Sequence, residues 1–263
     1  MCSHFRHIRS LLLAAMALTL LAALGPASLG GRALSETSPT ELPGLHGPTF
    51  VLRATTGRIL LPDGNSLLLW GFAGEGGEVQ YPGPTLIVNE GDTVTIHLAN
   101  TLPEEVSIIF PGQTGVLADG APVQPQLDEE GRLLSLTNVA PVGGEITYTF
   151  VARWPGTYLY ESGTNPAKQV QMGLFGALIV RPALGADYAY NDNRTQFDPQ
   201  REYLLLLHEL DPAIHAAVEQ GREPDLSVFA PRYGTINGRC FPDTVAPAGA
   251  PRLPAQPCSA TVV

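Results

Sequence analysis

The chain has 263 residues, enough for one or two domains, and carries 25 acidic against 15 basic side chains. A net charge of −10 argues against nucleic acid or anionic lipid as a partner, because both are bound by basic surfaces. No Cys-x-x-Cys occurs, and no cysteine–histidine cluster has the spacing of metal ligands.

Residues 1–34 have the three-part pattern of a secretory signal peptide. Arg6 and Arg9 precede an apolar run at residues 11–24, and small residues follow it. The run is 14 residues long, shorter than the ~20 residues that cross a bilayer, so a membrane anchor is the less favoured alternative. Removal of residues 1–34 leaves 12 basic against 25 acidic side chains, a net charge of −13. We expect an exported protein, secreted or periplasmic, with no membrane span.

A linker at residues 35–45 precedes a series of short predicted strands. In residues 93–98, Val94, Ile96 and Leu98 alternate with polar residues, as in a strand with one buried face. Further strands are predicted at 50–54, 67–72, 106–110, 145–151, 157–160 and 174–180, with a surface excursion at 111–131. Turn residues separate the strands and no long amphipathic helix occurs. The pattern therefore predicts an all-β, Greek-key β-sandwich over residues 46–182.

Residues 201–263 hold too few strands for a second sandwich, which needs about seven. The run at 203–210 predicts a buried strand, and a helix is expected at 211–220, with Asp211 as its cap and Pro212 at its first position. A strand and a turn are expected at 234–244. We interpret residues 201–263 as the incomplete start of a second domain. Cys240 and Cys258 could pair in an exported chain, although their spacing does not require a disulfide.

Two long motifs resemble the first plastocyanin-like (cupredoxin) domain of multicopper oxidases. They are Pro-Gly-Pro-Thr…Glu-Gly-Asp-Thr-Val at residues 82–94 and Gly-Thr-Tyr…Gln-Met-Gly-Leu-Phe-Gly-Ala-Leu-Ile-Val at residues 156–180. Residues 233–244 resemble the start of the second cupredoxin domain of the same family. The resemblance implies a cupredoxin fold, copper as the cofactor and oxidoreductase activity. Enzymes of this family take single electrons at a mononuclear copper and reduce oxygen to water at a trinuclear cluster.

The family's first domain supplies four imidazoles to that cluster, in two His-x-His pairs. Residues i and i+2 of a strand face the same side, so both rings of a pair reach one cluster. The resemblance places these pairs at positions that hold Ile109, Pro111, Glu161 and Gly163 here. Among these residues only Glu161 has a side chain that could touch a metal, and one carboxylate is a poor copper site. The His-Cys-His motif of the family's last domain is also absent from the chain. We therefore expect no copper in this chain and assign no catalytic or metal-binding residue.

The remaining histidines do not suggest a different metal site. His97 is expected on the polar face of its strand and His208 in a core. His215 is expected on a short helix with no nucleophile near it in the sequence. The leading hypothesis is a non-catalytic cupredoxin scaffold, as a fragment or truncated chain, whose partner is another chain or the remaining cupredoxin domains. One alternative is a subunit of an active oxidase whose copper ligands come from elsewhere. Another is a binding module with an apolar pocket lined by Ile109, Phe110 and Pro111.

Overall fold

The structure is a computed structural model that describes residues 42–246. The predicted signal peptide, residues 35–41 of the predicted linker, and Cys258 lie outside the described residues. No helix within residues 42–246 has the length and apolar character needed to cross a membrane.

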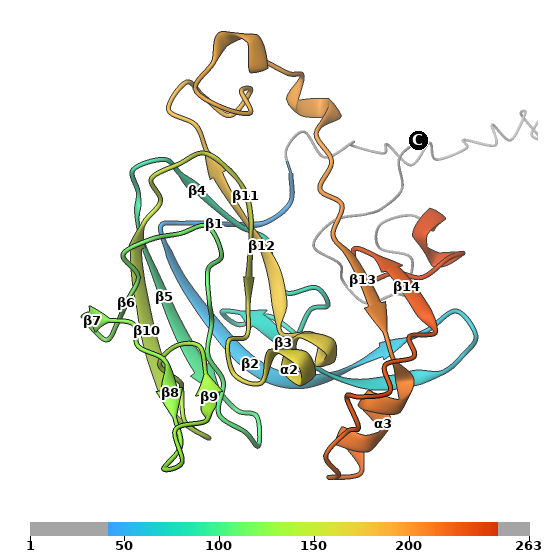
Figure 1. Cartoon of the computed structure of the whole chain (residues 1–263). Helices are drawn as coiled ribbons and strands as arrows, with labels where there is room; N and C mark the ends of the chain where they lie inside the picture. The colour runs from blue at the N-terminus through green and yellow to red at the C-terminus, as the bar shows by residue number, and fades with distance from the viewer. Residues whose placement is uncertain (1–41, 247–263) are drawn as a thin grey trace, which may run out of the picture. The chain divides into compact units, whose positions relative to one another are not determined.

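Two β-sheets form a sandwich (Figure 1). The smaller sheet has the order β1 (Leu45–His46), β4 (Leu86–Asn89), β12 (Phe175–Arg181) and β11 (Gly156–Glu161). The larger has the order β3 (Ser66–Gly74), β2 (Thr49–Leu60), β5 (Thr93–Asn100), β10 (Glu145–Val151), β6 (Leu117–Ala118) and β7 (Ala121–Pro122). Parallel pairs (β1–β4, β4–β12 and β2–β5) stand beside antiparallel ones. The predicted all-β sandwich is confirmed.

The core lies between the sheets because β5 and β10 alternate in phase. Ile146 pairs with Leu98, Tyr148 with Ile96 and Phe150 with Val94, so the apolar side chains of both strands share the inner face. These residues are buried together with side chains from the smaller sheet, such as Leu86 and Leu178. The alternation seen in the sequence is therefore what sets the register of the central strand pair.

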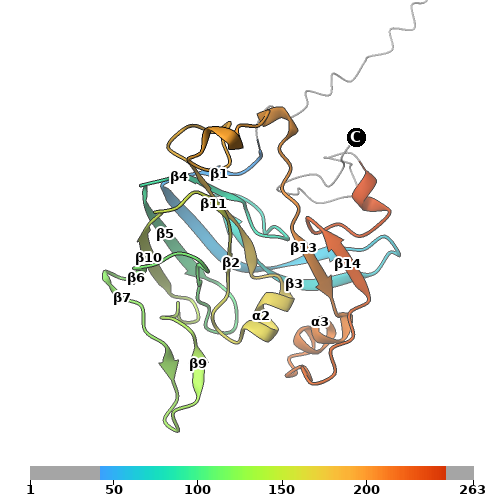
Figure 2. The same cartoon turned by 45° about the horizontal axis from the view of Figure 1, so that its top comes forward.

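The segment after β11 contains a helix that the sequence analysis missed. Helix α2 (Pro166–Met172) has proline in its first turn and ends at Gly173, whose φ of 119° only glycine adopts readily. The predicted strand at 106–110 is reduced to isolated bridges, one between Val106 and Ala140 and one between Ile109 and Glu161. Between residue 110 and Ala140 in the chain, β8 (Gln126–Leu127) and β9 (Leu133–Ser135) form a separate hairpin (Figure 2).

The C-terminal part of the described chain has two strands and one helix. β13 (Leu207–Leu210) pairs with β14 (Tyr233–Ile236), and α3 (Pro212–Glu219) lies between them in sequence. Short 3-10 turns at Asn193–Thr195 (η1), Pro199–Arg201 (η2) and Asp243–Val245 (η3) complete the elements. The Asp211 carboxylate accepts a hydrogen bond of 2.9 Å from the Ala213 N–H, so the predicted helix cap is confirmed.

The prediction of one buried strand at 203–210 is wrong in part. Leu204 and Leu210 are buried, but the side chains of Leu205 and Leu207 are 52% and 71% exposed. The strand proper begins only at Leu207, and its side chains alternate between the two faces of a two-stranded ribbon. A continuous run of leucines therefore hid a strand with one exposed face.

The buried face of this segment packs on the sandwich. Leu204 joins a cluster with Ile87 and Ile179. Leu210 and Cys240 join another with the side chains of Ile59, Leu61, Leu69, Tyr81 and Phe175. Helix α3 contacts β3 and α2. The C-terminal segment thus covers apolar residues of the sandwich that would otherwise face water.

Candidate functional site

The two segments that correspond to the family's histidine pairs lie side by side. The N–H of Ile109 donates to the carbonyl of Glu161 at 2.8 Å, and the N–H of Glu161 donates back to the carbonyl of Ile109 at 3.1 Å. Leu136 contributes a third segment, because its N–H donates to the carbonyl of Gly163 at 2.9 Å. The fold thus brings the first position of each pair together, as two His-x-His motifs that share one cluster would require.

The space beside Gly163 is taken by the side chain of Ile109. A Cβ atom at residue 163 would lie 2.7 Å from Cγ2 of Ile109 and 3.0 Å from Oγ of Ser107. Contacts under 3.0 Å between carbon atoms force a displacement. Ile109 is partly buried and Gly163 is buried. Two of the four ligand positions therefore form an apolar contact with each other and leave no room for a ring at residue 163.

A group of three hydroxyls borders this contact. Oγ of Ser107 lies 3.0 Å from Oγ of Ser135 and 2.9 Å from Oγ1 of Thr164, and Thr164 donates to Ser135 at 3.0 Å. Each hydroxyl can donate one hydrogen bond and accept others, so a closed ring of three satisfies all of its members. These groups bond to one another within the protein.

Ser162, between the two positions of the second pair, is tied to helix α2. Its Oγ lies 2.7 Å from Oε1 of Gln169, and Gln169 donates from Nε2 to the carbonyl of Glu105 at 2.9 Å. Both Ser162 and Gln169 are fully buried. This amide bridges the two ligand-bearing segments, so their relative placement is fixed without a metal.

Glu161 and Pro111 occupy the other two ligand positions, and their side chains take no part in the contact between Ile109 and Gly163. Glu161 ends β11 and is half-buried, and this burial raises the pKa of its carboxyl. Pro111 is exposed at a turn, and the next residue, Gly112, has φ of 87° with the Tyr158 ring where a side chain would lie. Neither residue has an imidazole or thiolate to offer.

The residues at these positions do not fit a copper ion. Copper in this family is held by imidazole and thiolate groups, whereas the four positions supply two hydrocarbon side chains, one glycine and one carboxylate. Across residues 42–246, no three His, Cys, Asp or Glu side chains gather as a metal site would need. The lack of fit to copper therefore rests on the chemistry of the side chains at the four ligand positions.

Two histidines form structural hydrogen bonds away from these positions. His97 is exposed on β5, and its Nδ1 lies 3.1 Å from Oγ1 of Thr147 on the neighbouring strand. His215 is fully buried on α3, with its Nδ1 2.5 Å from the carbonyl of Leu68. His97 matches the expected cross-strand residue, and His215 lies on the short helix that the sequence predicted.

A third histidine, His208, lies in β13 of the C-terminal segment. It stacks on Phe175 with 4.5 Å between ring centroids and contacts the Tyr81 hydroxyl at 2.7 Å. Burial lowers the pKa of its imidazole to about 4. The ring is therefore neutral at pH 7. His208 fits the predicted core histidine, except that one edge borders a surface hollow. The fourth described histidine, His46, lies in β1.

Cys240 is buried, and burial raises the pKa of its thiol to about 11. It has no disulfide partner within residues 42–246. Because Cys258 lies outside the described residues, the Cys240–Cys258 disulfide stays a prediction.

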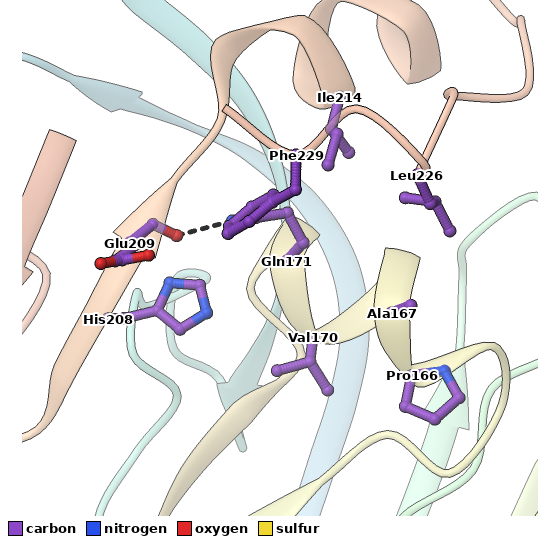
Figure 3. A pocket seen from close by; sticks show the side chains of 9 residues that line it. All are labelled: Pro166, Ala167, Val170, Gln171, His208, Glu209, Ile214, Leu226 and Phe229. Carbon is purple, nitrogen blue, oxygen red and sulfur yellow. Dashed lines mark hydrogen bonds between the residues drawn. The ribbon is translucent and has the colours of Figure 1, made fainter. Parts of the chain in front are cut away.

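A hollow of about 490 Å³ lies beside α2, and none of the four ligand positions is in its lining (Figure 3). Its walls come from α2, β13, α3 and the chain after α3. It is lined by Pro166, Ala167, Val170, Gln171, His208, Glu209, Ile214, Leu226 and Phe229. None of the three residues of the hypothesised apolar pocket, Ile109, Phe110 and Pro111, lines this hollow. The Phe110 ring instead packs in the core, with its centroid 4.8 Å from that of the Phe150 ring.

Comparison with known proteins follows the same segments. A multicopper oxidase family profile matches residues 73–184, which include all four ligand positions. This part of the chain is therefore similar to a multicopper oxidase domain. It is 34% identical over 124 residues to L-ascorbate oxidase from Cucurbita maxima, covering 47% of this chain and 19% of that enzyme. It is 31% identical over 129 residues to copper resistance protein A from Escherichia coli, covering 49% and 18%. Copper binding and oxidoreductase chemistry belong to this family.

Solved structures support the fold. A blue copper oxidase from Nitrosomonas europaea superposes with a TM-score of 0.52 at 24% identity, covering 74% of this chain and 55% of that one. A copper nitrite reductase from the same organism gives a TM-score of 0.51 at 22% identity, covering 80% and 62%. The chain spans about a fifth of the length of the curated relatives that it matches.

Proposed function

We propose that this is an exported protein in which residues 46–182 form a copper-free cupredoxin domain that serves as a scaffold. Residues 1–34 act as the signal peptide. The linker predicted at residues 35–45 is shorter at its end, because Leu42 is buried against the sandwich and Leu45 belongs to β1. Residues 201–263 form part of a second cupredoxin domain. In this proposal the chain itself carries out no oxidase reaction, and its function is to hold or recruit another domain.

The contact between Ile109 and Gly163 carries the proposal. A site that had merely lost its metal would keep room for four rings, whereas here Ile109 fills the space at residue 163. The buried amide of Gln169 and the three hydroxyls beside it are satisfied within the protein. These contacts support a domain whose packing at the ligand positions does not require copper.

The partner surface is the edge of the sandwich next to these positions. Leucines of the β8–β9 hairpin and the residue after it are exposed, with Leu127 at 57%, Leu133 at 55% and Leu136 at 42%. Exposed apolar groups in one area are typical of an interaction surface. Since Leu136 bonds to Gly163, this surface continues into the ligand positions. We assign it to another cupredoxin domain, of the same protein or of a second chain.

A copper assay tests the proposal. The exported protein is incubated with Cu(II), dialysed and analysed for copper, and its absorption spectrum is recorded. We expect far less than one copper per chain and no blue or near-ultraviolet copper band. A His97→Ala variant serves as the control, because this exposed imidazole could retain Cu(II) at the surface. One copper per chain that persists in the variant contradicts the scaffold and favours the alternative of an active oxidase subunit.

Export is tested separately. The full-length gene is expressed with its own leader, and the N-terminus of the protein outside the cytoplasm is determined by mass spectrometry. Cleavage between Ala27 and Ser35 is expected. An intact residue 1 in a cytoplasmic protein contradicts the assignment of residues 1–34.

A further inference from the structure

The hollow beside α2 has the size and lining of a small-molecule site. Its volume of about 490 Å³ lies within the range of ligand pockets, roughly 300–1,000 Å³. Six of its nine lining residues are apolar and come from separate segments: Pro166, Ala167, Val170, Ile214, Leu226 and Phe229. In Figure 3 these side chains surround the space from α2, α3 and the chain beyond α3. A ligand here would bury mostly hydrocarbon surface.

His208 supplies a polar edge that is held in place. Its Nδ1 is engaged by the Tyr81 hydroxyl at 2.7 Å, and its ring stacks on Phe175. No hydrogen bond to Nε2 occurs within the described residues. The other lining amide, Gln171, already donates from Nε2 to the carbonyl of Glu209 at 2.6 Å. The hollow therefore offers one fixed imidazole nitrogen to a bound molecule.

The charges around the hollow exclude charged ligands. Burial lowers the pKa of His208 to about 4, so its ring is neutral at pH 7. Glu209 is the charged member of the lining, and no Lys or Arg is among the nine residues. An anion would meet a carboxylate and no cation. A cation could pair with Glu209, but it would lose its hydration against six apolar side chains. An uncharged molecule avoids both penalties.

One wall is a strap at residues 222–230, which is tied down at both ends. Glu223 pairs with the buried Lys168 of α2 at 3.0 Å. The N–H of Ala230 donates to the second oxygen of the Asp211 carboxylate at 2.8 Å, while the first oxygen caps α3. The strap carries Leu226 and Phe229 into the lining. The hollow is thus held open by specific contacts on both sides of the strap.

We propose that this hollow binds a small, uncharged ring compound with one hydroxyl group. The ring lies between Val170 and Phe229, and the hydroxyl bonds to Nε2 of His208. A hydroxyl can donate or accept, so it suits either tautomer of the imidazole. The site is separate from the ligand positions of the cupredoxin domain, and its existence does not depend on the proposed scaffold function.

The test uses benzyl alcohol as the probe. It is titrated into the protein, and the His208 ring protons are followed by NMR, with the resonance assigned by its loss in His208→Phe. We expect a saturable shift with a Kd of roughly 1 mM, typical of a ligand of this size. The Ala167→Phe variant places a ring in the hollow from an exposed helix position and should weaken binding at least tenfold. Ala213→Phe, on the exposed start of α3 and outside the lining, should leave binding unchanged.

Charge and hydroxyl dependence complete the test. Benzoate should cause no saturable shift at tenfold higher concentration. Toluene should bind the unaltered protein more weakly than benzyl alcohol does, whereas the two compounds should bind His208→Phe equally. Binding is measured from the change in each ligand's own 1H NMR signal. Binding of benzoate as tight as that of benzyl alcohol overturns the proposal. An unaltered titration in the Ala167→Phe variant, or no saturable shift at all, does so as well.

Discussion

Tyr160 and Glu161 are neighbours at the end of β11, and their environments differ sharply. Tyr160 is fully buried, donates to the carbonyl of Pro84 at 2.6 Å and packs on Phe72. Glu161, at a ligand position of the family, is half-buried and its contact with Ile109 uses only backbone atoms. A packing residue stabilises the fold whether or not copper binds, whereas a ligand residue matters only when the metal is present. Loss of the ligands therefore need not affect the sandwich.

The segment after α2, like Tyr160, serves packing and does not depend on a metal. Gly173 has φ of 119°, and a Cβ there would lie 2.6 Å from the carbonyl oxygen of Trp70. At Gly176 a Cβ would lie 2.5 Å from ring atoms of Tyr160. The Gly-Leu-Phe-Gly motif thus has a steric purpose that is independent of metal. This explains how the motif remains recognisable while the histidine positions do not.

The largest expected effect comes from a substitution at a residue that packs the sandwich. Gly173→Ala should lower the free energy of unfolding by about 3 kcal/mol or more, because backbone strain and a clash with Trp70 add together. Urea denaturation measures it. Gly131→Ala is the control, since its φ of 78° is also left-handed but no heavy atom lies within 4 Å of the added carbon. A loss of about 1 kcal/mol is expected there. Equal losses in both variants would contradict the steric role of Gly173.

The second prediction concerns a histidine that serves packing. The folded-state pKa of His208 is about 4, below the ordinary value of 6.5. Between these pH values the unfolded chain binds the extra proton, so stability is full above about pH 6.5 and is lost as the pH falls toward 4. The expected loss between pH 7 and pH 5 is about 2 kcal/mol. The lowered pKa of His215 acts in the same direction.

Urea denaturation at pH 7, 6 and 5 checks this dependence. His208→Phe should reduce the slope and leave the part that His215 contributes, and the exposed His97→Gln should leave the profile unchanged. A slope that is not reduced in His208→Phe would mean that other groups cause it.

The third prediction addresses the ligand positions directly. Gly163→Ala should destabilise the protein by about 2 kcal/mol, since the added carbon meets Cγ2 of Ile109 at 2.7 Å. In an Ile109→Ala background that atom is absent, and the cost should be smaller by about 1 kcal/mol. A double-mutant cycle in urea gives the coupling energy. Strictly additive losses would show that Ile109 does not fill the space at residue 163.

The smallest effect is expected at the strap. Glu223→Gln weakens one partner of Lys168, and Glu223 is 68% exposed, so global stability should fall by at most about 0.5 kcal/mol. Limited proteolysis should nevertheless cut faster within residues 222–230. Glu219→Gln, which removes the charge that pairs with Arg58 at the end of α3, is a matched control just outside the strap. Equal cleavage rates in both variants would show that Glu223 does not tether the strap.

Much of the sandwich could be predicted from the sequence because alternation and turn residues are local signals. The strands β5 and β10 were both predicted from their apolar alternation, whereas their pairing is seen only in the structure. Helix α2 was missed, although Pro166 at its start and Gly173 at its end are ordinary helix signals. This short helix lies directly between two segments that the sequence predicts as strands, 157–160 and 174–180. The exposed face of β13 was missed because four successive leucines carry no periodicity.

The ligand positions could be located from the sequence, but their packing could not. Which side chain fills the space at Gly163 depends on residues 54 positions away in the chain, since Ile109 does so. The hollow was also unpredictable, because its walls come from α2, β13, α3 and the strap. Only the folded chain brings these segments together.

The packing of residues 204–240 on the sandwich has a consequence for synthesis. Leu61, Leu69 and Tyr81 share a buried cluster with Leu210 and Cys240, yet they leave the ribosome long before those partners exist. Since chains emerge at about 5–20 residues per second, these side chains remain uncovered for several seconds. For an exported chain this interval coincides with translocation. The late-arriving ribbon therefore completes a surface that chaperones would be expected to shield until β13 and β14 emerge.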